Sequence, residues 1–242
     1  MYQELPAGYV DLDRGVWRVI AARIELAEMS ALLDAVRSGA AGGEAAGSGG
    51  RGGARRHQLH GGKVVFVRKY LRGGFVRHFV KDLFVLRPPR PLLELVATET
   101  ARAAGCHVPI VHAVAVEEHG PFYRGWIVTS AIEGAHAYID ALLAADDAGR
   151  QKLLTEAGAA MRALVDAGVY HPDLNGHNLL LDAAGRIAVI DFDRAVVAAP
   201  GDERLADKGR ERFWRSLKKL TTQAGKPVDD GERRWLERGF TR

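Results

Sequence analysis

The chain has 242 residues, of which 47% are hydrophobic and 26% charged, as in a soluble globular protein with one or two compact units. Its single cysteine, Cys106, excludes an internal disulfide and fits a reducing compartment. The N-terminus lacks the basic and apolar regions of a signal peptide. No apolar run approaches the roughly 20 residues that span a bilayer. We therefore expect a protein of the cytoplasm or of a membrane surface.

The net charge is only +4, but the basic residues are concentrated in two segments. Residues 51–90 carry eleven Lys or Arg and one acid, and residues 204–219 carry seven Lys or Arg and two acids. A single run of this kind is usually solvated surface. Two runs favour an anionic partner, which can be a nucleotide, an acidic substrate or a negatively charged membrane surface. We expect no nucleic acid partner, because no zinc finger, RNP motif or basic zipper is present.

The first residues allow two interpretations. Residues 1–37 mix apolar and charged residues and fit either a helical face or a strand followed by a helix. Residues 38–56 contain eight glycines, and such a segment cannot pack a core. We expect residues 38–56 to form a loop, either a linker or a segment that contacts a ligand through its backbone.

Strands dominate the predictions for the next part of the chain. The pair Gly61-Gly62 separates two extended segments, residues 57–59 and 63–71. This pattern predicts a β-hairpin, because glycine adopts positive φ without steric cost. A helix and a second pair of strands follow, at residues 91–104, 110–116 and 122–130.

The remaining residues predict mainly helices. Residues 147–167 have apolar positions at helical spacing, with Asp147 as a candidate cap and Gly168 just beyond the end. A polar loop, a small apolar hairpin and a basic helical tail come next. This order predicts an α+β, two-lobed protein-kinase-like fold. The N-terminal lobe, residues 1–132, is small and β-rich, and the C-terminal lobe, residues 133–242, is mainly helical.

The strongest functional pattern is residues 171–178 (HPDLNGHN), followed by D-F-D at 191–193. It resembles the kinase catalytic loop H-x-D-L-x-x-x-N and its D-F-G partner. Phosphoryl transfer depends on positioning and electrostatics. Asp173 can accept the proton of the attacking hydroxyl, while Asn178 and Asp191 offer magnesium hard oxygen ligands. These residue types are also common in turns, but a hairpin between Asn178 and Asp191 would bring both to one end.

Three departures from the protein-kinase pattern bear on the acceptor. Pro172 replaces the arginine of H-R-D, and Asp193 replaces the glycine of D-F-G. Only 51 residues follow Asp191, without an A-P-E motif, which leaves little room for an activation segment and a peptide platform. We therefore expect a small-molecule or lipid-linked sugar acceptor. We expect His171 to support the loop rather than act as a base.

The glycines near residue 50 predict a loop that contacts ATP. Gly50, Arg51 and Gly52 lie shortly before the hairpin, where backbone N–H groups without obstructing side chains can approach phosphates. A glycine cluster alone is a weak signal, and the same residues fit a plain linker.

The cation that grips the phosphates is expected on the strand after the hairpin. Arg68 and Lys69 are the candidates, and only one can point to the ligand, because neighbours on a strand face opposite ways. Its expected partner is Glu94 or, as an alternative, Glu99 on the following helix. A solvent-facing charge is the competing interpretation for each of these residues.

Taken together, these motifs resemble the 3-deoxy-D-manno-octulosonic acid (Kdo) kinase family of lipopolysaccharide biosynthesis. The resemblance spans residues 50–220 and is carried by 170–178 (YHPDLNGHN) and 190–194 (IDFDR). Weaker support comes from 50–52 (GRG), 67–74 (VRKYLRGG), 104–109 (AGCHVP) and 215–220 (RSLKKL). The long Gly/Ala segment before Arg51 departs from the family pattern.

The resemblance implies a kinase-like fold and ATP-dependent phosphorylation of the 4-hydroxyl of Kdo on a lipid A precursor. It implies Asp173 as the base, Asn178 and Asp191 as magnesium ligands, and Arg68 rather than Lys69 as the strand cation. It also implies peripheral attachment to the cytoplasmic face of the bacterial inner membrane. The implied acceptor carries carboxylate and phosphate groups and sits in a membrane. We expect basic residues of a C-terminal helix to dock on that membrane surface: Arg210, Arg215, Lys218 and Lys219.

Two other functions stay open from the sequence. A small atypical kinase could act on another small molecule or on protein. A pseudokinase or membrane-binding scaffold would have no activity, although the intact Asp173, Asn178 and Asp191 disfavour it.

Overall fold

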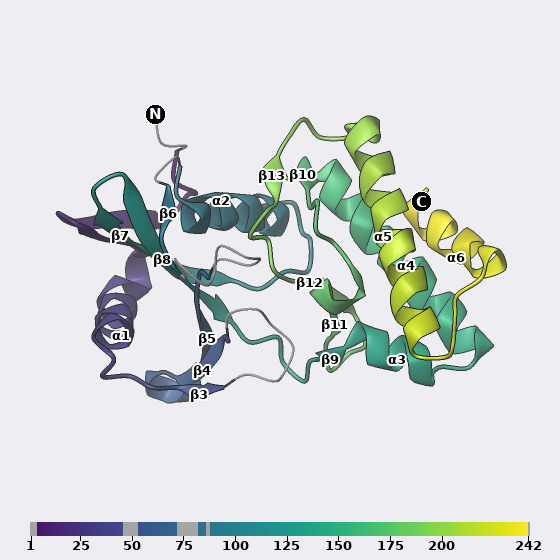
Figure 1. Ribbon diagram of the computed structural model, residues 1–242, viewed down its shortest axis with the longest axis horizontal. Coiled ribbons are helices and arrows are strands. Elements are labelled where there is room, and N and C mark those ends of the chain that lie inside the picture. Colours follow the sequence, from purple (N-terminus) through teal and green to yellow (C-terminus); the bar gives the residue numbers. More distant parts are fainter. Residues whose placement is uncertain (1–3, 46–52, 72–81, 86–87, 242) are drawn as a thin grey trace. The chain divides into compact units, whose positions relative to one another are not determined.

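The computed structural model describes residues 4–45, 53–71, 82–85 and 88–241 (Figure 1). The chain divides into two compact units, and each is described by itself. Unit 1 comprises Met1–Val96 and Ile110–Ala131, and unit 2 comprises Ala97–Pro109 and Ile132–Arg242. The predicted α+β class is confirmed, because a sheet dominates unit 1 and helices dominate unit 2.

Unit 1 is built on an antiparallel sheet with the strand order β1-β2-β7-β8-β5-β4-β3, and β6 also pairs with β8. Its strands are β1 (Tyr9–Arg14), β2 (Trp17–Ala22), β3 (Glu44–Ala45), β4 (Arg55–Gln58), β5 (Val64–Lys69), β6 (Phe84–Val85), β7 (Val111–His119) and β8 (Phe122–Ser130). Its helices are α1 (Leu26–Ser38), the first half of α2 (Arg90–Ala103), and the short 3-10 turns η1 (Arg23–Glu25) and η2 (His60–Gly62).

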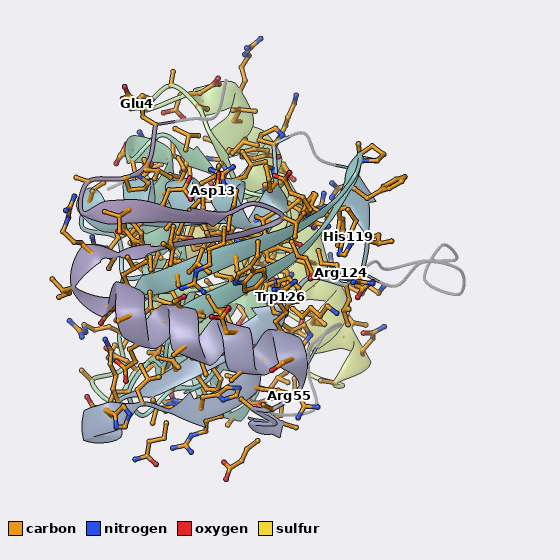
Figure 2. The ribbon with its side chains drawn as sticks, turned by 90° about the vertical axis from the view of Figure 1, so that its left-hand side faces the viewer. Glu4, Asp13, Arg55, His119, Arg124 and Trp126 are labelled. Atoms are coloured by element: carbon orange, nitrogen blue, oxygen red, sulfur yellow. The ribbon has the colours of Figure 1, made fainter. Side chains whose placement is uncertain are left out.

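The two faces of this sheet pack against different helices. Val65 and Val67 of β5 join a buried cluster with Met29 and Leu33 of α1. Residues of the opposite face, including Ile127 of β8, pack in another cluster with Leu92 and Leu95 of α2. Figure 2 views the sheet with α1 in front. Because strand side chains alternate between faces, neighbouring residues of β5 are directed to different helices.

The Gly61-Gly62 hairpin is confirmed. Strands β4 and β5 pair from Arg55↔Val67 to Gln58↔Val64, and both glycines have positive φ in the connecting turn. The expectation of loop throughout residues 38–56 was wrong in part. Exposed strand β3 and the first residues of β4 lie in this segment and pair with each other. A strand at a sheet edge needs only backbone hydrogen bonds, which an exposed Gly/Ala-rich segment can supply.

Unit 2 contains α3 (Tyr138–Ala144), α4 (Asp147–Asp166), α5 (Glu203–Gln223), α6 (Asp230–Phe240) and the second half of α2. Its short strands are β9 (His136–Ala137), β10 (Val169–Tyr170), β11 (Leu179–Leu181), β12 (Ile187–Val189) and β13 (Val196–Val197), with the 3-10 turn η4 (Gly176–Asn178) before β11. The N-terminal lobe had been expected to include all of α2. Residues 97–109 belong to unit 2 instead, because Ala97, Ala101 and Val108 are buried in its core.

Helices α4 and α6 approach each other closely at two glycines. A Cβ atom on Gly158 would lie 2.0 Å from the carbonyl oxygen of Leu236, and one on Gly239 would lie 1.8 Å from that of Thr155. Helix α6 begins at a capping box formed by Asp229 and Glu232.

Among the described residues, none of the helices is both long and apolar enough to cross a membrane.

Candidate active site

The loop of residues 171–178 is fastened to the end of β12 by His171. The side chain of His171 is 4% exposed, and its Nε2 lies 3.3 Å from the carbonyl oxygen of Ile190. Its ring packs against Phe192, with the centroids 5.2 Å apart. Burial lowers the pKa of His171 below its ordinary value despite the hydrogen bond to Ile190 and nearby carboxylates. His171 is therefore neutral at pH 7 and supports the loop, as the sequence predicted.

Asn175 shapes the middle of the loop. Its amide nitrogen donates to the carbonyl oxygen of Asp173 at 2.8 Å, and its side-chain oxygen accepts from the backbone N–H of His177 at 2.9 Å. The latter contact caps the 3-10 turn η4 that leads into β11. Asp173 and Asn178 are thus held in one hydrogen-bonded turn.

The hairpin β11–β12 brings Asn178 and Asp191 to the same end. The strands pair from Leu179↔Val189, and the N–H of Ile190 donates to the carbonyl oxygen of Asn178 at 2.9 Å. Asn178 lies just before this pair and Asp191 just after it. The predicted arrangement of Asn178 and Asp191 is therefore present in the backbone.

The environments of Asn178 and Asp191 differ. Asn178 is only 8% exposed, and its side chain forms no hydrogen bond within the described part of the chain. Asp191 is exposed and has φ of +64°. An amide oxygen without a protein partner and a nearby carboxylate suit a hard cation such as magnesium. The described residues include no cluster of three or more His, Cys, Asp or Glu with metal-binding geometry.

The carboxylate of Asp173 lies between two arginines. Arg212 of α5 reaches Oδ1 at 2.6 Å, and Arg194, which follows the D-F-D sequence, reaches Oδ2 at 3.3 Å. The Asp173 side chain is 33% exposed. It is accessible to a substrate and close to strong positive charge.

In unit 1, Arg68 is paired with Glu94. The guanidinium donates to both carboxylate oxygens of Glu94, at 2.6 and 2.7 Å. The hydroxyl of Tyr70 also donates to Glu94, and Arg68 lies over the Tyr70 ring. Glu94 is 3% exposed. The alternative partner, Glu99, instead pairs with Arg102 at 2.7 Å.

Lys69 points to the opposite face of the sheet. It lies across from Trp126 in the β5–β8 register, over the Trp126 ring, and its Nζ is 2.6 Å from Asp82. Burial alone would raise the pKa of Asp82, but Lys69 and Arg124 lower it below its ordinary value. Figure 2 shows Arg124 and Trp126 on this face. Arg68 and Lys69 therefore have separate environments, and Arg68 alone pairs with α2.

Three predicted residues, Gly50, Arg51 and Gly52, lie outside the described residues. Tyr70, which donates to Glu94, and Arg212, which pairs with Asp173, were not predicted from the sequence. Tyr70 is two positions after Arg68 and thus on the same strand face, a signal that was present in the sequence. Arg212 is 39 residues from Asp173, and no local pattern distinguishes it from the other basic residues around it.

Comparison with known proteins identifies similarities over most of the chain. Residues 39–228 match the model of the Lipopolysaccharide kinase (Kdo/WaaP) family. A 3-deoxy-D-manno-octulosonic acid kinase of Xanthomonas oryzae pv. oryzae (strain PXO99A) is 32% identical over 185 residues, covering 75% of this chain and 72% of that protein. The enzyme of the same name in Stenotrophomonas maltophilia (strain R551-3) is 31% identical over 210 residues, covering 86% and 82%. A MAP kinase structure from Leishmania major aligns with a TM-score of 0.43 and 17% identity, covering 69% of this chain and 50% of that one.

Proposed function

The chain belongs to the Lipopolysaccharide kinase (Kdo/WaaP) family and is therefore a phosphotransferase, and we propose that it transfers the γ-phosphoryl group of ATP to the 4-hydroxyl of Kdo on a lipid A precursor. The relatives named as Kdo kinases support this acceptor. The observation that carries the proposal is the arrangement of Asp173, Asn178 and Asp191 around one loop and one hairpin.

We assign roles by chemistry. Asp173 accepts the proton of the attacking hydroxyl, because its partly exposed carboxylate is the acidic group of the loop. Asn178 and Asp191 would hold magnesium through their side-chain oxygens. Magnesium, when bound, neutralises charge on the ATP phosphates. His171 keeps the loop and the end of β12 together and takes no proton.

In unit 1, Arg68 is the proposed phosphate-binding cation, and Glu94 orients it. A guanidinium held by both oxygens of a buried carboxylate has a fixed direction. Lys69 is directed to the face that α1 covers and is not assigned this role. Gly50, Arg51 and Gly52 stay candidates for the loop that contacts the ATP phosphates.

We further propose peripheral attachment to an anionic membrane surface at the cytoplasmic face of the inner membrane. Arg215, Lys218 and Lys219 of α5 are exposed, and within the described residues they form no ion pair. Arg210, also expected to contribute, is engaged with Asp207 and Glu237 and is therefore not available. Each basic residue near such a surface contributes about 1 kcal/mol.

Mass spectrometry of a Kdo–lipid A precursor incubated with ATP, magnesium and the protein tests the acceptor. We expect one added phosphate, located on the 4-hydroxyl by fragmentation or NMR. Asp173→Asn should lower the rate at least about 10²-fold, whereas the exposed control Asp140→Asn should not. Phosphate on another hydroxyl would correct the position. An unmodified lipid together with phosphorylated protein or another phosphorylated small molecule would refute the Kdo acceptor and favour the atypical-kinase alternative.

Co-sedimentation with phosphatidylglycerol-containing vesicles tests the membrane proposal. Binding should be strong at low salt and weak at high salt, because salt screens exposed charges. Replacing Arg215, Lys218 and Lys219 together with Gln should abolish it. Equal sedimentation of wild type and variant would contradict attachment through α5.

A further inference from the structure

The two arginines beside Asp173 come from separate, well-packed elements. Arg212 is followed on α5 by the buried residues Phe213 and Trp214. Arg194 lies in a turn closed by a 2.9 Å hydrogen bond from the N–H of Ala195 to the carbonyl oxygen of Phe192. Phe192 and Ala195 are both buried. The backbone of each arginine is therefore fixed by core contacts, and both side chains can reach the same point.

The carboxylate of Asp173 is contacted by two guanidinium groups at once. The structure places two guanidinium groups on one carboxylate, and in the described part of the chain neither Arg194 nor Arg212 forms another ion pair. Their side chains are 65% and 53% exposed. Each guanidinium has five N–H donors, so most remain available to a ligand. Both guanidinium groups adjoin the carboxylate oxygens that an acceptor hydroxyl must reach.

We propose that Arg194 and Arg212 bind an anionic group of the acceptor, a carboxylate or a phosphate, and so place its hydroxyl against Asp173. This inference rests on the proposed role of Asp173 as the base. Exposed ion pairs contribute little free energy, so each guanidinium can turn from Asp173 toward the substrate at small cost. The planar guanidinium also matches two oxygens of a carboxylate or phosphate.

A purely structural role predicts different kinetics. If the arginines only orient the Asp173 carboxylate, their loss lowers kcat and leaves the acceptor KM unchanged. If they bind the acceptor, their loss mainly raises the acceptor KM and leaves the ATP KM unchanged. The two roles are therefore separable by steady-state kinetics.

The test compares Arg212→Ala and Arg194→Ala with Lys208→Ala, a control that removes an exposed charge one turn earlier on α5. Because hydrogen bonds to charged groups are strong, we expect each arginine variant to raise the acceptor KM about 10- to 100-fold. Arg212→Lys should recover only part of the loss, because lysine keeps the charge without the fork. Unchanged acceptor KM values with reduced kcat would overturn the proposal.

Modified acceptors identify the anionic group. The arginine variants are assayed with the Kdo–lipid A precursor, with its Kdo carboxylate converted to an amide, and with its lipid A phosphates removed. If the carboxylate is the ligand, the effect of Arg212→Ala should largely disappear on the amide. If a phosphate is the ligand, the effect should disappear on the dephosphorylated acceptor. A penalty that is equal on all three acceptors would overturn the inference, since the cycle would show no coupling.

Failure of the proposed function is detected separately. If the folded wild type phosphorylates no Kdo acceptor, the proposed function fails. Isothermal titration calorimetry with free Kdo and with inorganic phosphate then tests whether Arg194 and Arg212 bind an anion. Arg212→Ala should bind one of these anions at least about tenfold more weakly than wild type and Lys208→Ala. Equal affinity in all three proteins, or no binding by the wild type, would overturn the anion site. Thermal unfolding of each variant excludes misfolding as the cause.

Discussion

Arg68 and Lys69 provide a matched comparison of two neighbouring cations with nearly identical ion-pair distances. Arg68 pairs with a carboxylate whose side chain is 4% exposed, while the carboxylate partner of Lys69 is 21% exposed. Replacing each cation with Met keeps most of the apolar stem and removes the charge. Any difference between the two variants therefore reports the environment of the acid that remains.

The burial of Glu94 sets the magnitude. Removing one partner of a buried ion pair costs about 3–5 kcal/mol. We expect about 2–3 kcal/mol for Arg68→Met, because Arg68 is 26% exposed and Tyr70 continues to donate to Glu94. For Lys69→Met we expect about 0–1 kcal/mol, the range for exposed pairs.

Urea unfolding followed by tryptophan fluorescence measures this difference. With a slope of about 2–3 kcal/mol per molar urea, Arg68→Met should lower the midpoint by about 1 M and Lys69→Met by a few tenths. Arg68→Met should also raise the ATP KM at least about tenfold if Arg68 grips the phosphates. Equal midpoints, or a larger loss for Lys69→Met, would refute the argument from burial. An unchanged ATP KM would remove Arg68 from the nucleotide site.

Three further predictions concern unit 2. Burial lowers the pKa of His171, so on acidification the unfolded chain takes up a proton at a higher pH than the folded chain does. The free energy of unfolding should therefore fall as the pH decreases below about 6.5. Between pH 7.5 and pH 5.5 the melting temperature should fall less for His171→Gln than for the wild type or the exposed control His136→Gln. Gly239→Ala should cost about 1–3 kcal/mol by forcing α6 away from α4, while Gly42→Ala, where the added methyl meets open space, should be nearly neutral in the same unfolding assay. Asp191→Gly and Asp191→Ala should both abolish phosphoryl transfer. Because Asp191 has φ of +64°, the Ala variant should be less stable than the Gly variant by about 1 kcal/mol. Equal melting temperatures of the two variants would contradict backbone strain at this position.

The sequence patterns predicted two helices whose positions depend mainly on nearby residues. The helix expected at 91–104 is observed at Arg90–Ala103, and the one expected at 147–167 at Asp147–Asp166. The predicted cap Asp147 was wrong by one residue, because the side chain of Asp146 accepts the capping hydrogen bond from Gly149. Apolar spacing and capping residues specify such helices without tertiary information. The β1–β2 hairpin was not resolved by sequence reasoning, because its outer strand is largely exposed and has no clean apolar alternation. The inner strand of this hairpin, β2, pairs with β7, which is almost a hundred residues later in the chain.

The candidate site divides in the same way. The proximity of Asn178 and Asp191 follows from a short hairpin, whose register is set by nearby apolar residues. The choice between Arg68 and Lys69 required the structure of the sheet. Strand alternation shows that the two side chains face opposite ways, but it does not show which face packs against α2. The position of Arg212 beside Asp173 could be recognised only from the packing of α5 on the loop of residues 171–178. The side chains of Leu217 and Leu220 of α5 pack against Gly176 in this loop.

The conformation of Asp191 connects the fold to the proposed chemistry. Among the described residues, Asp191 is the only non-glycine residue with positive φ, a conformation that Asp tolerates better than most residues but that is still unfavourable. The residue before it is hydrogen bonded to Asn178, and Phe192 after it is 1% exposed and packs on His171. The hydrogen bond of Ile190 and the buried side chain of Phe192 therefore fix the chain on both sides of Asp191, at the end of the hairpin where Asn178 lies.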